Sequence, residues 1–126
     1  MKPKKSHNQI FIVDDDASVG CALGILLITY GFKVDTFTSA KDFFRDVPHN
    51  SPGCLILDIH MPGLDGWETL KLIIKSGSKR PVIIISADKS GVNHERAMAA
   101  GATGYLQKPF NDRELVKFIN GALKNK

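Results

Sequence analysis

Short apolar runs alternate with amphipathic stretches along most of the chain. Most of the runs are continuous rather than interrupted by polar positions, which is typical of strands buried on both faces of a parallel sheet. They predict strands over residues 9–13, 33–37, 54–57, 81–85 and 104–107. The stretches that follow them predict helices over residues 17–30, 39–46, 67–75, 92–100 and 111–123. Five strands alternating with five helices indicate an α/β fold with one parallel sheet and helices on both faces.

Local signals support several of these boundaries. Gly31 follows the first helix and is a natural C-terminal stop. Ser39 with Asp42 resembles a capping box without the usual glutamate, and Asn111 with Glu114 has the complete pattern. Each pair predicts a helix start.

Composition and charge fit one globular domain. The chain has 126 residues, of which 43% are apolar. We expect one folded domain over residues 9–124, a flexible basic leader over residues 1–8 and no second domain. The net charge of +4 comes from lysines near the two ends: Lys2, Lys4, Lys5, Lys124 and Lys126. A basic arm on nucleic acid or anionic lipid is one interpretation. We favour solvated ends, because no nucleic-acid-binding pattern accompanies them, and expect no direct nucleic-acid or membrane contact.

The two cysteines and the first residues bear on the compartment. Neither Cys21 nor Cys54 belongs to a zinc-ligand spacing, so we interpret both as reduced thiols. Residues 2–9 are polar and do not form a signal peptide. We therefore expect a cytoplasmic protein.

Polar side chains that carry chemistry follow four of the five predicted strands. Asp14 and Asp15 follow the first strand, Asp58 the third, Ser86 the fourth and Lys108 the fifth. Because the functional crevice of such a sheet lies beyond the carboxyl ends of its strands, we expect these side chains to converge there.

Such a cluster favours a metal ion. Three carboxylates repel one another strongly, and a single lysine cannot balance them. A hard divalent cation with oxygen ligands resolves the imbalance, and Mg²⁺ suits a site with few protein carboxylates. A carboxylate can also attack phosphorus to give an aspartyl phosphate, with the cation, the lysine and the hydroxyl stabilising charge on the phosphoryl oxygens.

The segments around these residues resemble the receiver domains of two-component response regulators, and most of all the receivers of LuxR-type regulators. The resemblance covers about residues 9–124, and its motifs lie at residues 12–16, 57–66, 81–87 and 101–110. Any one motif is weak, but all four in this order are specific. The resemblance implies a doubly wound, flavodoxin-like sheet with strand order 2-1-3-4-5.

The resemblance also implies a role for each residue of the cluster. Asp58 is the phosphoacceptor. Asp15 and Asp58 bind Mg²⁺ directly, with the backbone carbonyl of His60 as a third ligand, while Asp14 acts through water. Lys108, the cationic residue of the cluster, pairs with the phosphoryl group.

Two further residues are implied to form the switch, and one to shape a loop. Ser86 hydrogen-bonds the phosphoryl group and moves toward it, and Tyr105 swings inward as Ser86 moves. Pro109 is expected to follow a cis peptide bond. His60 and Asp88, each two residues past a site residue, are hypothesised to tune the lifetime of the phosphoryl group.

The implied function is a phosphorylation-activated signalling switch rather than an enzyme. Its donor is a sensor histidine kinase or a histidine phosphotransfer protein, and its own catalysis is limited to its slow phosphorylation and dephosphorylation. The output is a changed surface on the last two helices and last strand, and a phosphorylation-dependent dimer is a further expectation.

Several alternatives stay open from the residues alone. The acidic run at residues 14–16 also suits a helix N-terminus, and we interpret Asp16 as a cap. Tyr105 also fits an ordinary core or surface aromatic residue, and His94 a surface residue. A haloacid-dehalogenase-type phosphatase and an interaction module that has lost phosphorylation are the rival functions.

The first predicted helix is unusual because residues 17–32 contain no charged side chain. We expect a core-facing stripe formed by Val19, Ala22, Leu23, Leu26 and Tyr30. We expect the opposite face, formed by Gly20, Cys21, Gly24 and Ile28, to be exposed. That face is either a tolerated apolar surface or a docking patch for the phosphodonor.

Overall fold

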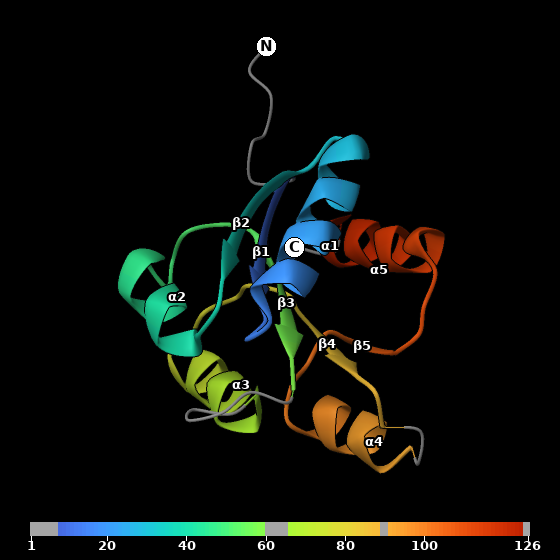
Figure 1. The fold of residues 1–126 in the computed structure, drawn as a ribbon. Coiled ribbons are helices and arrows are strands. Elements are labelled where there is room, and N and C mark those ends of the chain that lie inside the picture. Colours follow the sequence, from blue (N-terminus) through green and yellow to red (C-terminus); the bar gives the residue numbers. More distant parts are fainter. Residues whose placement is uncertain (1–7, 60–65, 89–90, 125–126) are drawn as a thin grey trace.

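The computed structural model describes residues 8–59, 66–88 and 91–124, and ten elements alternate within them (Figure 1). The strands are β1 (Gln9–Val13), β2 (Lys33–Phe37), β3 (Cys54–Asp58), β4 (Val82–Ser86) and β5 (Gly104–Gln107). The helices are α1 (Ala17–Thr29), α2 (Ala40–Asp46), α3 (Gly66–Lys75), α4 (Val92–Ala99) and α5 (Asp112–Lys124). All ten predicted elements are confirmed, with boundaries that differ by a residue or two.

The strands form one parallel sheet in the order β2-β1-β3-β4-β5, as predicted. Every residue of β3 and β4 is buried, because these strands have a neighbour on each side and helices on both faces. β2 is an edge strand and is largely exposed. The continuous apolar runs of the sequence therefore mark the inner strands.

The sheet separates two apolar cores, which explains why neighbouring residues of one strand are both buried. In β1, Phe11 belongs to the core covered by α2, α3 and α4, whereas Ile10 and Ile12 belong to the core covered by α1 and α5. This alternation follows from the two-residue period of a strand. It confirms the doubly wound architecture.

The prediction that Gly20 and Gly24 face outward on α1 was wrong. Both glycines are buried, together with Leu27. A Cβ atom on Gly24 would lie 3.3 Å from Cγ1 of Val34 on β2. The missing side chains let the helix lie close to the sheet, so glycine marks the packed face here.

The exposed face of α1 is correspondingly different from the one expected. Val19 and Tyr30, which were expected in the core stripe, are 39% and 43% exposed. Ile28 and Cys21 are exposed as predicted, and Ile25 lies with them at 60% exposure. An uncharged helix thus presents an apolar surface to solvent. Among the described residues, no helix is both long and apolar enough to cross a membrane.

Side-chain caps fix three helix starts where the sequence predicts them. Oδ1 of Asp16 accepts hydrogen bonds from the backbone N–H groups of Ser18 and Val19, at 3.0 and 3.3 Å. Oδ1 of Asn111 accepts from the N–H of Glu114 at 2.7 Å. These bonds satisfy N–H groups that have no partner inside the helix.

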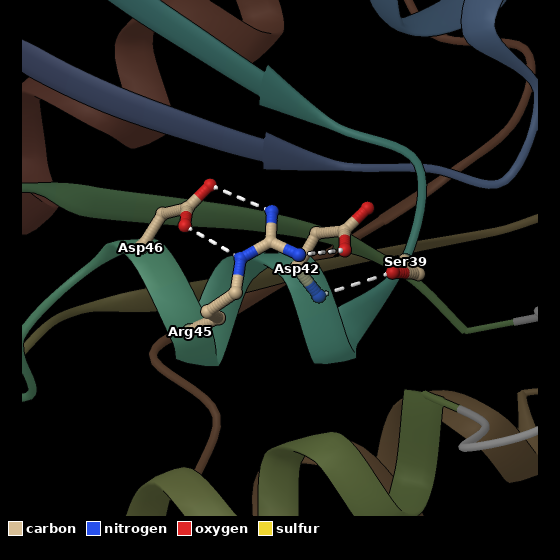
Figure 2. A network of polar contacts seen from close by, with 4 residues as sticks. All are labelled: Ser39, Asp42, Arg45 and Asp46. Atoms are coloured by element: carbon tan, nitrogen blue, oxygen red, sulfur yellow. Dashed lines mark hydrogen bonds and ion pairs between the residues drawn. The ribbon is translucent and has the colours of Figure 1, made fainter.

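The third cap belongs to α2 and lies in a small polar network (Figure 2). Oγ of Ser39 accepts a hydrogen bond from the N–H of Asp42 at 3.1 Å. Arg45 then pairs with Asp42 at 3.2 Å and with Asp46 at 2.8 Å on the exposed side of the helix. The pair with Arg45 lowers the pKa of the Asp46 carboxyl. This network supports α2 and lies outside the acidic cluster described below.

Candidate functional site

Three carboxylates meet at the carboxyl end of the sheet. β1 and β3 are neighbours, with Val13 paired to Leu57, so the residues that follow these two positions lie side by side. Asp14 is held there by a hydrogen bond from its N–H to the carbonyl of Phe37, at 3.0 Å. One carboxylate oxygen of each of Asp14, Asp15 and Asp58 lies within 4.8 Å of the others. The predicted convergence of the three acids is confirmed.

Lys108 approaches the same cluster from β5. Its N–H donates to the carbonyl of Ser86 at 2.8 Å, which ties the lysine loop to the end of β4. Its Nζ lies 3.6 Å from Oδ2 of Asp58. The Lys108–Pro109 peptide bond is cis, as predicted. The lysine therefore places its positive charge beside the predicted phosphoacceptor.

The cluster concentrates negative charge, and two of its three carboxylates have little exposure to solvent. Asp14 is 2% exposed and Asp58 is 8% exposed, whereas Asp15 is exposed. Burial raises the pKa of the Asp14 carboxyl, and the charges of Asp58 and Asp15 add to this. The hydrogen bond from the N–H of Asp16, at 2.9 Å to Oδ1, and the charge of Lys108 oppose the rise.

One carboxylate oxygen of Asp14 indicates that the cluster could bind a metal ion. Its second oxygen, Oδ2, is buried and has no hydrogen-bond partner among the described residues. Buried polar atoms in native proteins nearly always have a partner, so an orphaned carboxylate oxygen calls for one. An oxygen-liganded divalent cation fits this position, because two further carboxylates lie beside it. The predicted carbonyl ligand, that of His60, lies outside the described residues.

Ser86 is the last residue of β4 and is completely buried. Ile85 pairs with Asp58 across the two strands, so Ser86 stands one residue beyond the position opposite Asp58. Its Oγ accepts hydrogen bonds from the N–H of Asp88 at 3.1 Å and from Nδ2 of Asn93 at 3.4 Å. Both donors to the Ser86 hydroxyl therefore lie in α4 or in the segment that leads into it.

Tyr105 lies in β5 and is 8% exposed, within the core on the α4 side of the sheet. Its ring stacks on that of His94, with centroids 5.0 Å apart and planes 8° apart. Its hydroxyl donates to the carbonyl of Asp88 at 3.5 Å. Sequence reasoning did not find the contacts of Asn93 and His94. Both residues come from the first turn of α4, and their contacts depend on a helix orientation that no motif specifies.

Gly66 packs the start of α3 against the end of β3. Its N–H donates to the carbonyl of Ile59 at 3.2 Å. A Cβ atom at this position would overlap the main chain of Ile59, so the close approach requires glycine. The motif around residues 57–66 thus has a steric basis as well as a chemical one.

Comparison with known proteins identifies the family of this chain. Residues 10–120 match the family model of the response regulator receiver domain. The chain belongs to that family. It is a receiver domain of two-component signalling, in which phosphorylation operates a switch. The match disfavours the rival phosphatase, whose nucleophile would stand on the first strand.

Two curated relatives illustrate the similarity. The transcriptional regulatory protein FixJ of Bradyrhizobium diazoefficiens is 38% identical over 120 residues, which are 95% of this chain and 58% of FixJ. The response regulator protein TodT of Pseudomonas putida is 38% identical over 115 residues, 91% of this chain and 51% of TodT. The chain thus spans little more than half the length of these relatives.

Solved structures agree with the fold. The crystal structure of FixJ-N has a TM-score of 0.88 at 29% identity and covers 100% of this chain and 98% of that one. Full-length FixJ from B. japonicum has a TM-score of 0.86 at 36% identity, over 94% of this chain and 58% of that one. Receiver domains bind Mg²⁺ at an acidic pocket, which corresponds here to the three aspartates.

Proposed function

We propose that Asp58 accepts the phosphoryl group from a phosphohistidine of a sensor histidine kinase or a histidine phosphotransfer protein. A carboxylate oxygen of Asp58 forms the new bond to phosphorus while the bond from phosphorus to the donor nitrogen breaks, and the leaving imidazole nitrogen takes a proton from solvent. The observation that carries this proposal is the position of Lys108 Nζ, 3.6 Å from Asp58, beside three clustered carboxylates.

The other residues of the cluster position and balance the transferred charge. Asp14, Asp15 and Asp58 would hold a Mg²⁺ ion, with the carbonyl of His60 as a further ligand. The ion supplies charge stabilisation to the phosphoryl oxygens. Lys108 pairs with one of these oxygens, since its ammonium already lies beside the carboxylate that is modified. Ser86 hydrogen-bonds another, and Tyr105 changes position in response.

Two surfaces of the domain would bind partners, one for the phosphodonor and one for the output. The phosphodonor docks on the exposed apolar side of α1, around Ile25 and Ile28, which are 60% and 55% exposed. The output surface, including any phosphorylation-dependent dimer, lies on α4, β5 and α5. By analogy with FixJ, named a transcriptional regulatory protein, the switch serves transcription. We place the chain in the cytoplasm and assign it no catalysis beyond its own phosphorylation and dephosphorylation.

Intact-mass spectrometry after incubation with acetyl phosphate tests the chemistry without a kinase. With Mg²⁺, we expect the chain to gain one phosphoryl group, and with EDTA to gain none. Asp58→Asn should gain none under either condition, because the amide is not a nucleophile toward phosphorus. Asp35→Asn, which changes an exposed carboxylate on β2, is the matched control and should behave as wild type. Equal gain in Asp58→Asn would refute the assignment.

A further inference from the structure

The helix α4 is weakly anchored in the fold. Of its eight residues only Ala97 is buried, whereas α3 buries four of ten. Its N-cap is Gly91, with φ of 84°, and a glycine offers no side chain to cap the helix. An eight-residue helix with one buried residue has little local stability of its own. Because Ala97 is the one buried residue of α4, the side-chain contacts of its first turn contribute strongly to its position.

Two of these contacts come from consecutive residues and reach the two proposed switch residues. Asn93 donates its Nδ2 hydrogen to Oγ of Ser86 at 3.4 Å. His94 stacks its ring on that of Tyr105, almost parallel and 5.0 Å away. The first turn of α4 is thus in contact with both residues at once.

The contact between Asn93 and Ser86 is sensitive to any movement of Oγ, because it is already a long hydrogen bond of 3.4 Å. A serine hydroxyl has two acceptor lone pairs and one hydrogen to donate. In the structure Oγ accepts from both Asp88 and Asn93, so both lone pairs are engaged. If Oγ itself moves toward a phosphoryl group on Asp58 to donate its hydrogen, the contact with Nδ2 of Asn93, already 3.4 Å, exceeds hydrogen-bond length.

The second contact resists movement of Tyr105. The tyrosine is 8% exposed, and His94 covers one face of its ring. Its hydroxyl also donates to the carbonyl of Asp88, whose own N–H binds Ser86. Any displacement of the tyrosine ring must break the stack or carry α4 with it.

We propose that Asn93 and His94 are the positioning residues that couple Ser86 and Tyr105 to α4. Their two contacts hold the first turn of α4 in place, and rearrangement of Ser86 and Tyr105 releases it. This inference rests on the proposed phosphorylation of Asp58. It deepens that function by naming the residues through which the site controls its output helix.

A third contact of α4 provides a reporter. The guanidinium of Arg96 lies over the ring of Trp67 on α3, 4.1 Å from its centroid. Trp67 is the single tryptophan of the sequence. Its fluorescence therefore reports the position of α4 independently of backbone exchange.

Four variants separate coupling from helix stability. His94→Ala removes the stack, and His94→Phe keeps a ring that can stack on tyrosine. Asn93→Leu removes the donor while introducing a residue of higher helix propensity, so a weaker helix cannot explain its effect. Glu95→Ala is the control, because it truncates an exposed side chain of the same turn.

The experiment measures hydrogen exchange of residues 92–99 and Trp67 fluorescence, before and after phosphorylation by acetyl phosphate with Mg²⁺. In wild type, His94→Phe and Glu95→Ala, phosphorylation should speed exchange by about fivefold or more, the lower end of typical coupling between sites. In His94→Ala and Asn93→Leu, exchange should already be fast, with less than about a twofold further change and a similarly reduced fluorescence response. Intact mass confirms in each sample that the phosphoryl group is present.

The outcomes separate the inference from the function beneath it. Absence of phosphoryl gain in wild type would overturn the proposed function, and the inference with it. Phosphoryl gain in every variant, with a wild-type exchange response in His94→Ala and Asn93→Leu, would overturn the inference alone. A phosphorylated wild type whose α4 exchange is unchanged would do the same.

Discussion

Replacing Asp14 with asparagine should stabilise the folded chain in the absence of divalent metal. The carboxylate is 2% exposed and lies within 4.8 Å of two others. At an effective dielectric constant of about 20, two unit charges at this separation repel by roughly 3 kcal/mol. Lys108 offsets part of this, and the asparagine oxygen still accepts the N–H of Asp16. We expect a net gain of about 2 kcal/mol in the free energy of unfolding, after these offsets.

The assay is urea unfolding monitored by Trp67 fluorescence, at neutral pH, with EDTA or with excess Mg²⁺. In EDTA the variant should unfold at higher urea, while Asp35→Asn should lie within about 0.5 kcal/mol of wild type. With Mg²⁺ the advantage should shrink, because a ligand that binds only the folded state stabilises wild type more than a variant lacking one ligand group.

The pH dependence has a defined sign. Burial raises the pKa of Asp14 in the folded chain above its ordinary value of 3.8, so the folded chain binds the proton more tightly than the unfolded one. The destabilisation is therefore full above the folded-state pKa and disappears as the pH falls toward 3.8. The difference between variant and wild type should close over that interval. A variant that is less stable than wild type in EDTA at neutral pH would refute the reasoning.

The remaining predictions concern α1 and the lysine. Gly24→Leu should destabilise the fold by about 1–3 kcal/mol in urea unfolding, because its side chain meets Val34 on β2; an unchanged midpoint would contradict the packing of α1. Ile28→Lys should slow phosphotransfer from a kinase but not phosphorylation by acetyl phosphate, and equal loss of both would exclude a docking role. Lys108→Met should slow phosphorylation by acetyl phosphate about 100-fold while Mg²⁺ still raises the melting temperature; a wild-type rate would remove the lysine from the chemistry.

The sequence was sufficient to predict the sheet and the acidic cluster, for related physical reasons. Strands buried on both faces must be continuously apolar, so β1, β3 and β4 stand out as runs. Charged residues directly after such runs must lie at one edge of the sheet. Asp14, Asp58 and Lys108 could therefore be brought together before any coordinates were known.

The orientation of α1 was not predictable in the same way. A helix without charged residues has no polar face to identify its outer side, so the apolar stripe of residues 19–30 fitted more than one rotation. Burial of Gly20 and Gly24 depends on how closely the helix lies to β1 and β2, which is a property of the packed structure. The two glycines, four residues apart, fit a face packed closely on a sheet, but we expected them on the exposed face.

The side-chain contacts of α4 could not be predicted from the sequence, for a different reason. Asn93 and His94 belong to no motif, and His94 looked like a surface residue. Its side chain is indeed exposed, but one face of its ring covers Tyr105. A stack of this kind follows from the relative placement of α4 and β5, which the sequence pattern does not encode.

Chemical mapping of the phosphoryl group tests the central claim most directly. Borohydride reduces an aspartyl phosphate to homoserine, which marks the modified position in a peptide map. After acetyl phosphate and Mg²⁺, homoserine should appear at position 58 and at no other aspartate, and it should be absent when EDTA replaces Mg²⁺. Homoserine at Asp14 or Asp15, or a phosphoryl group retained on the chain without any homoserine, would contradict the account.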